Sequence, residues 1–194
     1  KQMETRMLYE NEIPAAAETA RGIFEHCVKE KIADPQIIRY TEEYLQTEQL
    51  LGLIRQSQLY MWGTFDAGRI IAVGGLQREG HITMLYVFPY YQKQGLARTI
   101  ASEMKKYADK FLHLKRITVN AMPVEAAGYF ETLGYSRMDT KGNGTNGFVS
   151  LSLSTQGKCD YPVKHIKERT LIGIIVGFLA AIFVIAIGFV LSCL

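Results

Sequence analysis

Residues 84–97 read MLYVFPYYQKQGLA, and within this stretch an apolar strand turns into the polar start of a helix. Pro89 cannot join a normal strand ladder, so we expect the strand to separate from a neighbour there and leave backbone groups open. Gly95 allows a positive φ or a close approach of the backbone, and the helix after it begins with open N–H groups. With Lys93 and Arg98 beside it, the loop is predicted to hold an anion such as a pyrophosphate. An ordinary strand-to-helix connection with surface charges is the alternative at this point.

The rest of the chain alternates between helical and strand patterns. Apolar periodicity predicts helices over residues 13–28, 41–56, 96–111 and 124–134. Strand patterns cover residues 59–65, 69–77, 81–88, 116–122 and 147–154. Asp66-Ala67-Gly68 is typical of a hairpin turn, and Met7-Leu8-Tyr9 could open the sheet as a leading strand. The predicted order is ααβββαβαβ.

The opening stretch resembles the acyl-CoA-binding segment of the GNAT superfamily of N-acetyltransferases. That segment follows the pattern Val-x-Pro-x-x-Gln/Arg-x-x-Gly-x-Gly/Ala, met here by Val87, Pro89, Gln92, Gly95 and Ala97. Residues 119–135, VNAMPVEAAGYFETLGY, look like the later strand and helix of the family with its aromatic-Glu-x-Leu-Gly-aromatic signature. The run GHITMLYV at 80–87 is similar to small bacterial members. The resemblance implies an α+β fold with a mixed, mainly antiparallel central sheet flanked by helices.

The resemblance also implies acetyl-CoA as the cosubstrate. The backbone of Leu85, Tyr86 and Val87 would pair with the pantetheine arm, and a main-chain N–H there would stabilise the oxyanion. The pyrophosphate would lie on the loop and helix start, with Lys93 and Arg98 as phosphate ligands. That loop comprises Gln92, Lys93, Gln94, Gly95, Leu96 and Ala97, followed by Arg98.

Two residues are candidates for proton transfer. Some histone-modifying relatives carry a glutamate base six residues before the valine, and His81 stands at that position here. A histidine, with an unperturbed pKa of about 6.5, could accept a proton near neutrality, although His81 could also be an exposed strand start. The family's usual tyrosine acid is replaced by Phe130, and Tyr129 would point about 100° away on a helix. There are three alternatives for the general acid: Tyr129 serves through a shifted helix, another tyrosine serves, or the thiolate leaves without an acid.

Composition excludes several other classes of function. The three cysteines are scattered and fit neither a disulfide framework nor a zinc site, and the histidines lack metal-ligand spacing, so we expect no metal. The net charge of +3 owes much to basic residues between 158 and 169, just before an apolar segment. Such a cluster indicates membrane topology and anionic headgroups rather than nucleic acid.

Residues 171–191 are all apolar or glycine, and as a helix they would span roughly 30 Å, the thickness of a bilayer core. The positive-inside rule places the bulk of the chain in the cytoplasm on a single-pass anchor. We therefore expect an acetyltransferase domain at 1–155, a basic juxtamembrane linker at 156–169 and a transmembrane anchor at 170–194. Gly173 and Gly177 form a Gly-x-x-x-Gly face that could support a homodimer. The span could also be the first of a longer protein.

The predicted activity is acetyl transfer from acetyl-CoA to a primary amine of a small molecule or protein, by direct attack. A catalytically weak, membrane-anchored CoA-binding or sensing module is the alternative, favoured by Phe130 in place of the family's tyrosine.

Overall fold

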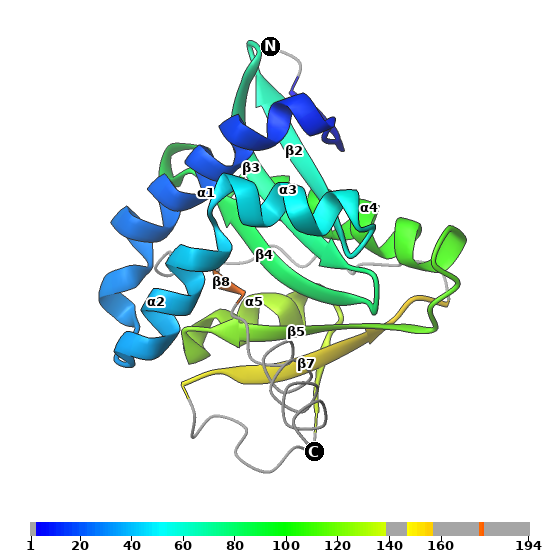
Figure 1. The fold of residues 1–194 in the computed structure, drawn as a ribbon. Helices are drawn as coiled ribbons and strands as arrows, with labels where there is room; N and C mark the ends of the chain where they lie inside the picture. The colour runs from blue at the N-terminus through cyan, green and yellow to red at the C-terminus, as the bar shows by residue number, and fades with distance from the viewer. Residues whose placement is uncertain (1–2, 139–146, 157–174, 177–194) are drawn as a thin grey trace, which may run out of the picture.

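The fold is built on a mixed sheet, seen in a computed structural model that describes residues 3–138, 147–156 and 175–176 (Figure 1). The described strands join one eight-stranded sheet in the order β1-β2-β3-β4-β5-β7-β6, with β8 pairing β5. Their bounds are β1 Glu4–Met7, β2 Leu59–Asp66, β3 Arg69–Gln77, β4 His81–Val87, β5 Arg116–Met122, β6 Ser136–Arg137, β7 Val149–Ser154 and β8 Ile175–Val176.

Neighbouring strands run antiparallel except for β4 and β5, which are parallel. The strands β2, β3 and β4 follow one another through short turns, so they pair as a meander. The chain from β4 to β5 instead passes through a helix, which is the connection that parallel strands require. The predicted mixed, mainly antiparallel sheet is confirmed.

Helices cover both faces of this sheet. On one face α1 packs against β3 and β4, and α3 packs against β2; on the other, α4 packs against β2, β3 and β4, and α5 against β5 and β7 (Figure 1). Two apolar cores result, one beneath α1 and one beneath α4 and α5. The helices are α1 Ile13–Cys27, α2 Pro35–Tyr44, α3 Thr47–Arg55, α4 Leu96–Lys110 and α5 Ala127–Thr132, with short 3₁₀ turns η1 Glu10–Glu12, η2 Lys29–Lys31, η3 Pro89–Tyr91 and η4 Val124–Ala126.

The predicted helix over residues 41–56 is wrong, because this region contains two helices. α2 begins earlier, where the Asp34 side chain accepts a hydrogen bond from Gln36 N at 2.8 Å and Pro35 occupies the first helical position. The chain then breaks at Leu45 and Gln46, where Gln46 is extended (φ −67°, ψ 140°). An Asp-Pro pair is a known helix-start signal, so the true beginning of α2 was readable in the sequence.

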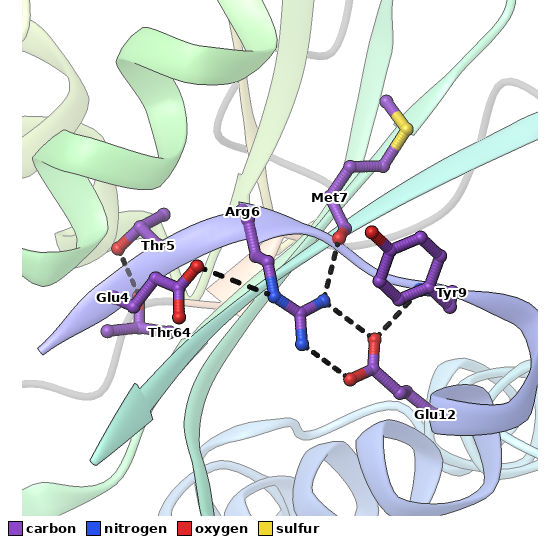
Figure 2. A network of polar contacts seen from close by, with 7 residues as sticks. All are labelled: Glu4, Thr5, Arg6, Met7, Tyr9, Glu12 and Thr64. Atoms are coloured by element: carbon purple, nitrogen blue, oxygen red, sulfur yellow. Dashed lines mark hydrogen bonds and ion pairs between the residues drawn. The ribbon is translucent and has the colours of Figure 1, made fainter. Parts of the chain in front are cut away.

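The N-terminal strand is fastened to the start of α1 by a polar network (Figure 2). Arg6 donates to both oxygens of Glu12, at 2.8 and 2.6 Å, and to the Met7 carbonyl at 3.1 Å. Glu12 also accepts from Tyr9 N at 2.8 Å. The hydrogen bond from Arg6 lowers the pKa of Glu12 below its ordinary value, as expected for a bidentate arginine–carboxylate pair. The network ties the edge strand β1, which pairs with β2, to the turn that leads into α1.

The predicted membrane anchor falls almost wholly outside the described residues. Of residues 170–194, only Ile175 and Val176 are described, and they form the short strand β8 opposite Ala121 and Met122. Within the described part of the chain, no helix has the length and apolar character needed to cross a bilayer. The linker beyond Gln156 also lies outside the described residues, so the anchor stays a prediction.

Close packing between β3 and α4 gives a first testable prediction. A Cβ at Gly74 would collide with the side chain of Ile100, whereas a Cβ at Gly52, in α3, meets nothing within 4 Å. Gly74→Ala is therefore expected to lower the free energy of unfolding by about 1–3 kcal/mol, the usual range for overpacking. Gly52→Ala is the matched control and should raise it by roughly 0.5–1 kcal/mol. Urea unfolding of the full chain in detergent measures both, and equal effects would contradict the described packing.

Candidate active site

The parallel strands β4 and β5 part soon after they meet. They pair only at His81–Thr118 and Ile82–Val119 among the described residues, while β4 stays paired with β3 as far as Val87. One edge of β4 beyond Ile82 therefore has no β5 partner, and the short strand β8, which pairs with β5, lies close to β4. The sequence predicts a separation at Pro89, but it begins at the residue after Ile82, well before the proline.

A β-bulge in β4 accounts for this parting. Gly75 of β3 lies opposite Met84, and the next residue, Leu76, lies opposite Ile82, so Thr83 is an extra residue in β4. A bulge bends its strand and increases the local twist, which turns the edge of β4 away from a straight neighbour. Pro89 is therefore not the cause of the separation.

The bulge also shifts the alternation of side chains along β4. Met84 and Tyr86 belong to the core beneath α1, whereas Leu85 and Val87 belong to the core beneath α4. All four side chains are buried. The predicted pantetheine-binding residues Leu85, Tyr86 and Val87 thus fill the two cores with their side chains, and what they can offer a ligand is the main chain on the unpaired edge.

The loop after β4 leads directly to the N-terminus of α4. Gln92 Nε2 donates to the Val87 carbonyl at 3.0 Å and holds the loop against the end of the strand. Lys93 and Gly95 both have positive φ, 63° and 83°, and Gly95 is the residue that precedes the helix. Alternating positive φ values turn successive N–H groups into a concave, anion-binding arrangement.

The first turn of α4 is well placed to contact an anion. No described side chain caps this helix start, so its first N–H groups have no acceptor from a capping residue. Lys93, Gln94 and Gly95 are exposed, and Arg98 is half-buried. Leu96 and Ala97 point into the core beneath α4 and fix the helix start on the sheet. The predicted phosphate-binding residues therefore form one continuous segment, an exposed loop followed by the first turn of α4.

A hydrogen bond between Tyr91 and Asp66 also stabilises this loop, and the sequence pattern did not predict it. The Tyr91 hydroxyl donates to Asp66 Oδ2 at 2.9 Å, and this hydrogen bond is the main cause of the raised pKa of Tyr91. Asp66 is buried at the end of β2, so the η3 turn is tied to the β2–β3 hairpin. The sequence pattern identified Asp66 only as part of a hairpin turn, because its partner Tyr91 comes after β3 and β4 in the chain.

The two predicted catalytic residues, on β4 and α5, lie near opposite ends of β5. His81 is buried beside the last β4–β5 pairs, and its Nδ1 lies 3.0 Å from Thr118 Oγ1. Tyr129 is on α5, which follows the far end of β5 after Met122. Four residues of extended strand, about 13 Å, separate Thr118 from Met122. His81 therefore lies where β4 and β5 still pair, and Tyr129 lies on the helix that follows the other end of β5.

Phe130 has a structural role in the core. Its ring is fully buried, 5.4 Å from the ring of Tyr135 and 5.9 Å from that of Tyr129. Tyr129 is half-buried beside it and packs against the same core. Phe130 therefore fixes α5 against the core, and Tyr129 is the residue on this helix with a phenolic hydroxyl. Among the described residues, no group of three or more His, Cys, Asp or Glu is arranged to share a metal ion.

Position 95 requires glycine because of its backbone conformation, and not because a side chain would collide with a neighbour. A Cβ there meets nothing within 4 Å, but φ is 83°. Gly95→Val should weaken acetyl-CoA binding by roughly tenfold or more, because the left-handed conformation costs a non-glycine residue about 1–2 kcal/mol and valine adopts it least readily. Gly95→Asn is the matched variant and should bind more tightly than Gly95→Val, since asparagine tolerates this region. Titration calorimetry with acetyl-CoA measures both, and equal affinity in all three proteins would rule out the proposed conformation of the loop.

Comparison with known proteins places this geometry in a family. The family described as acetyltransferase (GNAT) domain matches residues 25–150, more than half of the chain. No curated protein matches the chain.

Solved structures share the fold at low identity. The PaiA N-acetyltransferase of Thermoplasma acidophilum, solved with coenzyme A, is 20% identical with a TM-score of 0.62, covering 79% of this chain and 99% of that one. A GCN5-related N-acetyltransferase of Rhodopseudomonas palustris is 19% identical with a TM-score of 0.64, covering 79% and 96%. The spermidine/spermine N-acetyltransferase SpeG of Vibrio cholerae is 18% identical with a TM-score of 0.54, covering 79% and 94%.

The predictions of an acyltransferase and of acetyl-CoA as its cosubstrate are confirmed at the level of the family. With its parted strands, its left-handed glycine and the match over most of the folded domain, the chain belongs to the GNAT family of acetyltransferases.

Proposed function

We propose that this protein transfers the acetyl group of acetyl-CoA to a primary amine of a small molecule or a protein, by direct attack of the amine. The observation that carries the proposal is the unpaired edge of β4, which leads through a braced loop to an uncapped helix start. The family match supports acetyl transfer, and the likeness to a spermidine N-acetyltransferase supports an amine acceptor.

The described residues fit the donor. Acetyl-CoA supplies an activated thioester when bound. Within the segment Leu85–Val87, the main chain of alternate residues offers N–H and C=O groups on an edge that a pantetheine arm can pair with. The N–H groups from Gln94 to Ala97 face the pyrophosphate, and Lys93 and Arg98 add positive charge beside it. A main-chain N–H of this edge polarises the thioester carbonyl.

His81 and Tyr129 handle the protons in this proposal. His81 lies two residues before the bulge, where β4 and β5 still pair and just before the edge of β4 becomes available. It accepts the proton of the attacking amine. Tyr129, on α5, donates to the departing thiolate. The support for the role of His81 is its position at the last paired residues of β4 and β5, and the support for Tyr129 is its place on the helix that follows β5.

The proposed enzyme is attached to the inner face of a membrane. The unbroken apolar segment 171–191 and the basic residues before it support a single-pass anchor with the catalytic domain in the cytoplasm. In the anchored state Ile175 and Val176 would not keep the pairing with β5 that they make as β8. Such an anchor restricts the enzyme to amines that reach the membrane surface. A homodimer through Gly173 and Gly177 belongs to the same proposal.

The alternative is a CoA-binding module with little catalytic activity. The burial of Phe130 favours it, because the position of the family's tyrosine carries a ring without a hydroxyl, locked in the core.

Release of CoA from acetyl-CoA distinguishes the two functions. The full chain in detergent would be assayed with four kinds of amine: a polyamine, an amino sugar, an amino acid and a lysine peptide. Acetylation of at least one is the expected result. Acetyl-CoA binding without turnover of any amine would support the module instead, and absence of binding would overturn both.

The role of His81 is tested by its removal. His81→Ala should lower kcat by roughly 10²–10⁴-fold, the usual contribution of a general base, and abolish the acidic limb of the pH–rate profile. His26, exposed near the end of α1, provides the control, and His26→Ala should leave both unchanged. A His81→Ala enzyme with the wild-type profile would exclude the proposed role.

A further inference from the structure

The extra residue of β4 is held by a buried chain of hydrogen bonds. The Tyr44 hydroxyl donates to Thr83 Oγ1 at 3.1 Å, and Thr83 Oγ1 donates to the Gly75 carbonyl at 3.4 Å. Tyr44 is 8% exposed and Thr83 is 2% exposed. The bulge is therefore tied on one side to β3 and on the other to α2, of which Tyr44 is the last residue.

The surrounding residues are shaped for this contact. A Cβ at Gly75 would lie 2.9 Å from Thr83 Oγ1 and 3.1 Å from Met84 Cγ, so glycine leaves the room that the bulge occupies. Burial raises the pKa of Tyr44, and its phenol stays a donor throughout the physiological range. A valine at position 83 would fill the same volume without making either hydrogen bond.

The position of the bulge determines where the open edge of β4 begins. The last β4–β5 pair is at Ile82, and Leu85, Tyr86 and Val87 follow on the unpaired edge. If Thr83 relaxed into the regular ladder, the alternation of all later residues in β4 would change by one position. The main-chain N–H groups that face the donor would then point elsewhere.

We propose that Tyr44 is a positioning residue for acetyl transfer, which acts through Thr83 to fix the bulge and thereby the N–H group that faces the thioester carbonyl. This inference rests on the proposed function, because it assigns Tyr44 an effect on the same site. In this proposal the Tyr44 hydroxyl holds Thr83 in position and takes no part in the chemistry, and the phosphate-binding loop does not depend on it.

Paired substitutions separate this role from simple packing. Tyr44→Phe removes only the hydroxyl, Thr83→Val removes the central hydroxyl at constant shape, and Thr83→Ser keeps it. Tyr44→Phe and Thr83→Val should each lower kcat by about tenfold to a hundredfold, the cost of misplacing a reacting group by about 1 Å. The KM for acetyl-CoA should change less than kcat, because the pyrophosphate loop is intact. Thr83→Ser should restore most of kcat.

Tyr40 provides the matched control. It lies on the same helix, is 38% exposed and contacts Arg39 through its ring, so Tyr40→Phe should retain wild-type kcat. In the double variant Tyr44→Phe/Thr83→Val, kcat should be no lower than in Thr83→Val alone, since both changes break one chain. Fully multiplicative losses, or a Tyr44→Phe enzyme with wild-type kcat, would overturn the proposal.

Amide hydrogen exchange gives a second readout that needs no turnover. In the ligand-free protein, Tyr44→Phe should speed exchange at Thr83, Met84 and Leu85 while leaving the rates in β2 unchanged. If the wild-type protein acetylates no amine, the proposed function fails, and the exchange rates alone decide whether Tyr44 holds the bulge. Unchanged exchange in β4 would overturn the inference whatever the activity.

Discussion

The structure depends on one extra residue in β4. Because Thr83 has no counterpart in β3, the strand bends there, and everything after it is rotated relative to β5. The same residue decides which side chains enter which core. Met84 and Tyr86 are directed beneath α1, and Leu85 and Val87 beneath α4, so both cores depend on the register that the bulge sets. A change of register would exchange these side chains between the two cores and disrupt the packing of both, and this makes the edge a stable feature of the fold.

The donor site joins this strand edge to a helix N-terminus through a short loop. Strand edges offer hydrogen bonds to an extended arm, and helix starts offer N–H groups to phosphate, so the two ends match the two parts of coenzyme A. Their relative position is fixed at two points: Gln92 holds the loop to Val87, and Tyr91 holds it to Asp66. Neither of these hydrogen bonds involves Lys93, which is exposed. Its side chain can therefore turn toward a ligand without breaking the contacts that hold the loop.

The sequence was sufficient for the elements with a strong local pattern and insufficient for those set by distant contacts. The three-strand meander, α1, α4 and the left-handed Gly95 each follow from residues close together in the chain. The bulge does not, because β4 is buried throughout and has apolar residues on both faces, so no alternation marks the extra residue. Pro89 seemed the only available cause of the separation. Likewise, Asp66 and Tyr44 act through partners far along the chain, Tyr91 and Thr83.

The chemistry of acetyl transfer is less constrained by the backbone than the binding of the donor. Phe130 is needed in the core, so α5 cannot present that position to a thiolate, and any proton donor must come from elsewhere. Burial raises the pKa of Tyr44 and Tyr86, which makes both reluctant to release a proton. Tyr129 is half-buried on α5, so its side chain keeps some contact with solvent. A thiolate leaves readily even with weak assistance, because its conjugate thiol has a pKa of about 8.5. The exchange of tyrosine for phenylalanine is therefore compatible with turnover, provided that the bulge keeps the thioester carbonyl against its N–H donor.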